Sequence, residues 1–308
     1  MALMAPADRV NLLADDWALV EAGRLEPQSY FELIEELGDD DDRAVWDQIV
    51  RTFNRLDYLA RGRAERPALQ FYARAKLRPV FDRLGWDTPG GESEDDALLR
   101  GRLIRTLGEL GDEQILAEAR RRFTAFQQNP AALRPALREP VTHLVGLTTD
   151  RAGYDALLAL ARKTTNTNER TRYYSAAASA RSPDLARATL ALTLTDELPT
   201  TLVGNIIGTV ASSGEQTDLA WAFVRENFQA LADKQGPSFR NYFVSNFMMN
   251  FSDAAHVAEL AAFGPVHATS GGKMVASRAE ESILISAELK ARALPALAAW
   301  IKKRNGQD

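Results

Sequence analysis

Histidine and cysteine, the residues that most often bind metals or act as nucleophiles, are scarce in this chain. The 308-residue sequence has no cysteine, which excludes disulfides, zinc–cysteine sites, iron–sulfur clusters and a thiol nucleophile. Its three histidines are His143, His256 and His267, and none belongs to a His-Glu-x-x-His pair. We interpret His143 and His256 as structural side chains. The residues by themselves predict no metal site and no catalytic residue.

Three other groups of residues could suggest chemistry, and each has a simpler interpretation. The segment Ser270–Lys273 resembles part of a phosphate-binding loop, but Met274 stands where that loop needs Ser or Thr, and no strand precedes it. The acidic run Asp39–Asp42 lacks the spaced carboxylates and the turn glycine of a calcium loop. The arginines Arg120–Arg122 point about 100° apart on a helix. We therefore expect Ser270–Lys273 to be a linker, Asp39–Asp42 to be the start of a helix, and Arg120–Arg122 to lie on a solvated helix face.

Composition excludes two classes of partner. Lys and Arg number 37 against 42 Asp and Glu, a net charge of −5, whereas nucleic-acid binding needs a basic surface. No stretch reaches the roughly 18 apolar residues of a membrane span, and the first residues lack the features of a signal peptide. We expect a soluble protein that binds neither nucleic acid nor membrane, with the cytoplasm as the favoured compartment.

Apolar residues recur at helical spacing along almost the whole sequence. Trp46, Ile49, Val50 and Phe53, for example, share one helix face. One helix should follow the acidic run, and we expect others at about 8–21, 27–37, 66–84, 95–110, 112–128, 141–147, 150–163, 168–180, 183–194, 200–212, 217–234, 237–250, 253–263 and 273–303. Pro130, Pro135 and Pro140 predict a broken segment before 141–147, and Pro295 predicts a kink or a split in the last helix.

Some fifteen helices joined by short links predict an all-α fold. They suit an α-α superhelix of antiparallel helix pairs, like that of HEAT or armadillo proteins. No strict sequence repeat is present, so the repeats must be degenerate. We expect a single helical-repeat domain over residues 1–308.

Several segments, in this order, resemble the C-terminal helical domain of zinc aminopeptidases. That family includes aminopeptidase N, the endoplasmic-reticulum aminopeptidases and puromycin-sensitive aminopeptidase. The matching segments are Asp8–Leu19 with Gly23, Leu98–Gly101, Glu118–Phe123, Leu137–Val141, Leu219–Leu231 and Glu280–Ile301. The Leu-Leu-Arg-Gly segment and the triple arginine point to the puromycin-sensitive branch.

The resemblance implies a curved helical bowl that closes over a catalytic domain and limits access of peptide substrates. In the family, zinc is held by a His-Glu-x-x-His helix and a downstream Glu in that catalytic domain, and this sequence contains neither. The parent protein would be a zinc metalloaminopeptidase, a hydrolase acting in proteolysis. This chain would be its excised, non-catalytic C-terminal domain, with no cofactor of its own. Its partners would be the catalytic domain of the same polypeptide and peptide substrates.

Two arginines on matching segments, Arg100 and Arg138, are the candidate peptide-facing or interdomain residues. The alternative is an ion pair within the domain, which is common for arginine. The sequence departs from the puromycin-sensitive pattern at Ala136 and Thr142, which stand where that pattern has Asp and Tyr. The loop Ala211–Gln216 also lacks an arginine that some relatives carry, so a carboxylate-gripping role for this loop is in doubt.

A second hypothesis comes from a different class of protein. A stand-alone helical-repeat scaffold would bind a protein or a peptide on its concave face. A reading frame that extends upstream into a His-Glu-x-x-His domain favours the aminopeptidase hypothesis, and a gene that starts at Met1 favours the scaffold.

Overall fold

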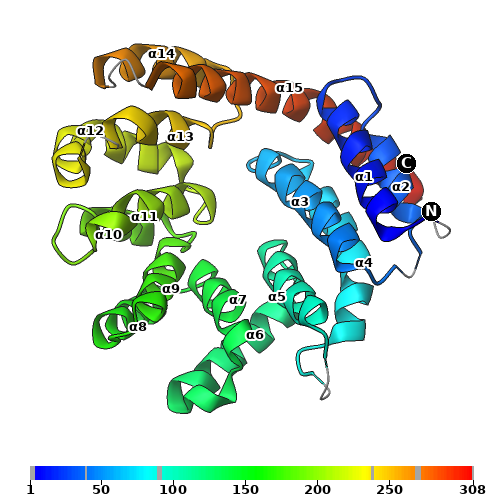
Figure 1. Cartoon of the computed structure of the whole chain (residues 1–308), viewed down its shortest axis with the longest axis horizontal. Coiled ribbons are helices and arrows are strands. Elements are labelled where there is room, and N and C mark those ends of the chain that lie inside the picture. The colour runs from blue at the N-terminus through cyan, green and yellow to red at the C-terminus, as the bar shows by residue number, and fades with distance from the viewer. Residues whose placement is uncertain (1–3, 39, 89–91, 237–238, 268–271, 307–308) are drawn as a thin grey trace. The chain divides into compact units, whose positions relative to one another are not determined.

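The computed structural model describes residues 4–38, 40–88, 92–236, 239–267 and 272–306, with the side chains of 265–267 left out. Figure 1 shows its fifteen α-helices, and no strand occurs in these ranges. The all-α fold is therefore confirmed. The α-helices are α1 (Pro6–Glu21), α2 (Gln28–Glu35), α3 (Arg43–Leu59), α4 (Arg66–Leu84), α5 (Glu94–Glu109), α6 (Glu113–Gln128), α7 (Pro135–Leu147), α8 (Arg151–Lys163), α9 (Thr167–Ala178), α10 (Pro183–Leu192), α11 (Thr200–Ser212), α12 (Thr217–Gln235), α13 (Val244–Met248), α14 (Ala255–His267) and α15 (Lys273–Arg304). A 3₁₀ turn, η1 (Pro130–Ala132), and a π-helix, η2 (Phe239–Phe243), complete the chain.

Side-chain caps fix the starts of several helices, because the first backbone N–H groups of a helix have no intrahelical partner. Asp42 accepts hydrogen bonds from the Ala44 and Val45 N–H groups at α3, so the part of the acidic run that the structure describes does open a helix. Ser93 caps α5 through the Asp96 N–H, and Asp150 caps α8 through the Gly153 N–H. Polar residues in these loops thus set the helix boundaries.

Proline disrupts the helices less than the sequence predicts. Helix α7 starts at Pro135, where a missing N–H costs nothing, and continues through Pro140. Pro140 forgoes one hydrogen bond but is buried, with its ring beside Gly101 of α5. Likewise α15 is not split at Pro295. The predicted break is confirmed between the end of α6 at Gln128 and the start of α7 at Pro135, but it was wrong for residues 135–140, which are helical.

The predicted helix 237–250 also differs. Residues 237–238 lie outside the described residues, and η2 and α13 cover 239–248. The wider π turn is consistent with an aromatic residue at every fourth position, at 239, 243, 247 and 251, because these rings contact one another in succession. Helix α14 extends to His267, past the expected end at 263.

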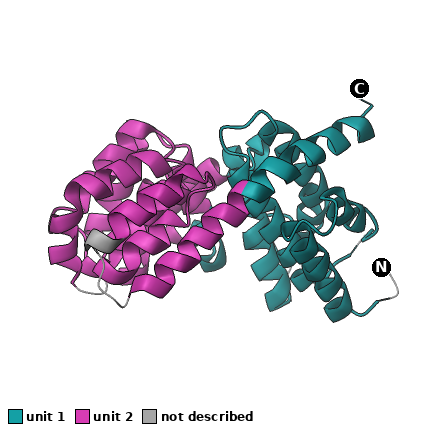
Figure 2. Ribbon diagram, turned by 90° about the horizontal axis from the view of Figure 1, so that it is seen from above, with its two compact units in different colours: residues 1–118, 131–140, 288–308 teal, residues 119–130, 141–287 magenta. Residues whose placement is uncertain are grey.

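Two compact units make up the chain (Figure 2). Unit 1 comprises residues 1–118, 131–140 and 288–308, and unit 2 comprises residues 119–130 and 141–287. Unit 1 therefore combines the first five helices with the last part of α15. The prediction that residues 1–308 form a single domain stays a prediction, and each unit is described by itself.

In unit 1, α3 packs against α1 and α5, while α4 packs against α3 and α5. The core is aromatic. Phe31 of α2 stacks on Tyr72 of α4 with ring centroids 4.4 Å apart, and the edge of Trp300 from α15 lies 5.7 Å from both rings. These large side chains bury much apolar surface, and their edge-to-face arrangement adds a further favourable contribution. The end of α15 is therefore part of the core that the first helices form.

In unit 2, consecutive helices form pairs, and the pairs stack. Helices α8 and α9 form one pair and α11 and α12 another, while α9 packs on α11 and α10 on α12. Trp221 of α12 stacks on Phe247 of α13 at 5.8 Å and meets Phe263 of α14 edge-on at 5.1 Å. This stacking is the arrangement expected of helical repeats. The curvature into a bowl stays a prediction.

Candidate functional site

Both histidines whose side chains are described have structural surroundings. His143 is 6% exposed, and its Nδ1 lies 3.3 Å from the Ser179 hydroxyl, which donates to the Ser175 carbonyl. The His256 ring lies 3.7 Å from that of Phe251, and its Nδ1 is 3.3 Å from Glu259. His267 ends α14, and its side chain is not described. The Ser179 hydroxyl beside His143 is fully buried and donates to a backbone carbonyl, so we interpret this pair as a packing contact within the helices.

The chemistry of a zinc site needs three or four converging nitrogen, sulfur or oxygen ligands. Within the part of the chain that the structure describes, no three His, Asp or Glu side chains converge in this way. The described residues do not fit a zinc ion, and we assign it to none of them. Of the Ser270–Lys273 segment, Ser270 and Gly271 lie outside the described residues and Lys273 is the first residue of α15.

Arg100 is a buried residue that closes the end of a neighbouring helix. It is 4% exposed, its Nε donates to the Gly85 carbonyl at 2.8 Å, and a terminal nitrogen donates to the Leu84 carbonyl at 3.1 Å. It also forms an ion pair with Glu92. These carbonyls are at the negative end of α4, where a cation is stabilising. The guanidinium is therefore held within unit 1.

Arg138 lies apart from these partners, on the first turns of α7. Its Nε donates to the Leu133 carbonyl at 3.3 Å, and the side chain is partly exposed. Arg100 and Arg138 thus engage different carbonyls, at the ends of different helices. Their peptide-facing or interdomain role stays a prediction.

A network of paired charges joins α3 and α5. Arg43 bonds to Asp95 at 2.6 Å and to Asp47 at 2.8 Å, and Asp47 also meets Arg102 at 3.3 Å. Asp47 is largely buried, so its two cations compensate for the cost of removing its charge from water. This row of alternating charges links the two helices.

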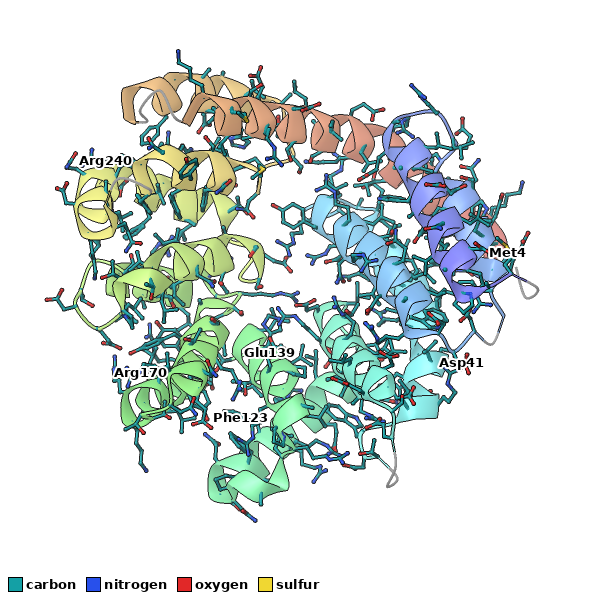
Figure 3. The ribbon with its side chains drawn as sticks, viewed as in Figure 1. Met4, Asp41, Phe123, Glu139, Arg170 and Arg240 are labelled. Carbon is teal, nitrogen blue, oxygen red and sulfur yellow. The ribbon has the colours of Figure 1, made fainter. Side chains whose placement is uncertain are left out.

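The network continues to α7 through a residue that the sequence did not single out. Arg105 of α5 bonds to Glu109 at 3.0 Å and also pairs with Glu139, which is labelled in Figure 3. Glu139 is the unspecified position within the Leu137–Val141 motif, next to Arg138, and this adjacency was the signal available. Such a face can bind polar groups, but its charges are already paired.

The loop Ala211–Gln216 presents a carboxylate. Ser212, at the place where some relatives are expected to carry an arginine, donates its hydroxyl to the Gly208 carbonyl at 2.7 Å. Glu215 has a left-handed backbone with φ of 57°, and it pairs with Arg181 at 2.7 Å. This strained conformation is uncommon for a residue with a side chain. The loop therefore offers an ion pair built from this chain's own residues.

No helix in the described ranges combines the length and the apolar character that crossing a bilayer requires.

Comparison with known proteins assigns the helical chain to a family. Residues 2–285 match the ERAP1-like C-terminal domain. The chain is 30% identical to aminopeptidase M1-A of Oryza sativa subsp. japonica over 255 residues, which is 79% of this chain and 28% of that protein. It is 30% identical to aminopeptidase M1 of Arabidopsis thaliana over 187 residues, 59% of this chain and 21% of the relative. It is 22% identical to aminopeptidase N of Plutella xylostella over 311 residues, 98% of this chain and 33% of the relative. The chain spans about a fifth to a third of these relatives' length, and it belongs to the family of ERAP1-like C-terminal domains.

Proposed function

We propose that this chain is the C-terminal, cavity-closing domain of a zinc-dependent aminopeptidase that removes N-terminal residues from peptides. The observation that carries the proposal is the family match across residues 2–285, on a chain that is helical throughout its described ranges. In this proposal the chain supplies no catalytic residue. The zinc ion and the general base belong to a catalytic domain of the same polypeptide.

Finer features of the proposal rest on the sequence. The puromycin-sensitive branch is supported by the Leu98–Gly101 segment and by the triple arginine Arg120–Arg122. We further propose a cytoplasmic location and a single domain over residues 1–308. A domain that closes over the active site excludes water and orders the substrate near the metal, which is how a non-catalytic part raises the rate.

Two measurements test the proposal. The isolated 308-residue chain should bind no stoichiometric zinc and hydrolyse no aminoacyl-anilide, whereas a polypeptide that carries the preceding catalytic domain should do both. The first measurement is metal analysis with turnover assays on the purified chain, and the second is sequencing of the transcript that encodes it. Zinc-dependent turnover by the chain alone would refute the proposal. A transcript with no upstream His-Glu-x-x-His domain would favour the scaffold that binds a partner on its concave face.

Substitutions of Arg138 and Arg100 test the proposed peptide-facing role, because the two variants should have different effects. In the longer polypeptide, we expect Arg138→Gln to raise KM for a long peptide severalfold and to leave an aminoacyl-anilide unaffected. Arg100→Gln is the matched control, because it removes a buried cation from the end of α4 and should lower the unfolding temperature of the isolated chain. Equal effects of Arg138→Gln on both substrates would contradict a role in contacting the distal peptide.

A further inference from the structure

One exposed face of α4 carries a row of apolar residues. Pro67, Phe71, Ala75 and Pro79 are all exposed, and they are spaced four residues apart. Side chains at this spacing form one ridge along a helix. The side chain of Phe71 is 54% exposed, more than that of Tyr242, the other exposed aromatic residue among those described. A large apolar ring left in water on a row of apolar neighbours marks an interaction surface.

Cations border this row, and two of them have no carboxylate partner among the described residues. Arg83 continues the ridge beyond Pro79, and it donates only to the Asp40 carbonyl, at 3.5 Å. Arg74, one turn from Phe71, donates only to the Leu110 carbonyl, at 2.5 Å. Among the described residues, therefore, no carboxylate balances the positive charge of either guanidinium group at the edge of the row.

The rest of α4 shows that this charge is local. The helix holds five cations, Arg66, Arg74, Lys76, Arg78 and Arg83, against one anion, Asp82, in a chain whose net charge is −5. Three of the five are neutralised, because Arg66 pairs with Asp57, Lys76 with Glu35 and Arg78 with Asp82. The uncompensated charge is thus confined to the two arginines beside the apolar row.

We propose that the row Pro67–Phe71–Ala75–Pro79 docks an amphipathic, acidic α-helix of a second protein. An exposed ridge of residues four apart is the element that helix–helix packing uses, and Ala75, between Phe71 and Pro79, is small enough for an apolar side chain of the partner to approach the helix there. Carboxylates beside that side chain meet Arg74 and Arg83. Such complementary charges give specificity and orientation.

Two other occupants fit these charges poorly. A symmetric contact between two copies of α4 places the uncompensated arginines of both copies at one interface, where like charges repel. An anionic membrane or a nucleic acid recognises a cluster of free cations, whereas most of the α4 cations are already paired.

The test uses a fluorescent peptide of about 18 residues, five helical turns, with Leu on one face and Glu along its flanks. Anisotropy should report binding to the 308-residue chain with a Kd on the order of 100 μM, typical of a small interface, and salt should weaken it. Phe71→Ser should weaken binding about tenfold or more, as expected for a central anchor. Leu98→Ser is the matched control, because Leu98 is 55% exposed on α5, outside the row, and its removal should change nothing.

Charge is tested separately. Arg83→Gln should weaken binding severalfold and reduce its dependence on salt, and a peptide with Lys in place of Glu should not bind. Equal binding by the wild-type chain and Phe71→Ser, or equal binding of the acidic and basic peptides, would overturn the proposal. Self-association in analytical ultracentrifugation that Phe71→Ser abolishes would also overturn it, because the row would then bind a second copy of this chain. Binding to phosphatidylserine vesicles that depends on Phe71, without binding of the acidic peptide, would overturn it in favour of a membrane.

Discussion

Glu35 of α2 is the carboxylate that accepts hydrogen bonds from two other helices of unit 1, α4 and α15. It accepts hydrogen bonds from the Tyr72 hydroxyl at 2.8 Å, from Lys76 of α4 at 2.5 Å and from Arg304 of α15 at 2.7 Å. Burial alone would raise its pKa, but the hydrogen bonds from Lys76 and Tyr72 and the nearby positive charges outweigh burial and lower it. The charged form is therefore the one that stabilises the fold.

We expect Glu35→Gln to lower the free energy of unfolding at pH 7 by about 1–3 kcal/mol, the range for losing charged hydrogen bonds. A lowered pKa gives stability that is fully present above the ordinary value of 4.5 and is lost as the pH falls through the lower value of the folded state. Urea unfolding at pH 7 and near pH 3 should thus show a difference that shrinks in acid. A constant difference across this range would contradict the assignment.

Asp16 of α1 has a pKa that is shifted in the opposite direction. The pKa of its carboxyl is raised by burial, which outweighs the hydrogen bond from Ser29, and Glu32 raises it further. A raised pKa means that the fold favours the protonated form, so this contribution to stability is lost as the pH rises through the pKa of the folded state.

Asp16→Asn should therefore stabilise the chain at pH 7, by about 0.5–1 kcal/mol, because a neutral amide keeps the acceptor for Ser29 without the buried charge. The gain should vanish in acid, where Asp16 is protonated. The same urea experiment measures it, and the two variants should shift in opposite directions at pH 7.

At the scale of elements, the crossing of α7 and α9 depends on the absence of one side chain. A Cβ on Gly146 would overlap the Ala176 carbonyl of α9. Gly146→Ala should therefore force the two helices apart and cost about 3 kcal/mol or more, measured by chemical unfolding. Gly208→Ala in α11 is the control, because a Cβ there meets nothing within 4 Å. That variant should be neutral or should stabilise by up to about 1 kcal/mol, as alanine does in a helix. Similar losses in both variants would contradict the close crossing.

Most helices could be predicted from the sequence, and the exceptions have physical reasons. Helices α4 and α11 lie at the predicted residues because apolar periodicity and clear boundary residues agree there. The first half of helix α7 was missed because its prolines lie at the first position and in the second turn, where one lost hydrogen bond is tolerated and Pro140 is buried. The π turn in η2 was not predicted, because aromatic residues four apart fit an α-helix equally well.

The candidate site was less predictable, because ion pairs depend on which helices become neighbours. Arg100, Arg102 and Arg105 look equivalent in sequence, yet the first closes the end of α4, the second pairs with Asp47 and the third with Glu139. Only the fold decides between these partners. That the sequence has no His-Glu-x-x-His motif, by contrast, can be read from it directly.

At the scale of the whole molecule, residues 288–304 complete unit 1. Leu289, Leu297 and Ile301 are at most 2% exposed, and Arg292 donates to the Val20 carbonyl. Removing residues 288–308 should therefore abolish hydrogen-exchange protection of α1 and α2. The milder Ile301→Ala variant should cost about 2–5 kcal/mol. Removing only residues 305–308 is the control, and unchanged protection of α1 after the longer deletion would contradict this role.

The same closure sets the order in which the protein can fold as it is made. Arg292 lies 272 residues after its partner Val20 in the chain. At a synthesis rate of about 5–20 residues per second, the first helices leave the ribosome roughly 15–50 s before the helix that completes their core. During that interval the rings of Phe31 and Tyr72 lack the Trp300 edge that packs on them in the finished fold. The nascent chain should therefore expose aromatic surface that chaperones can bind until α15 has emerged.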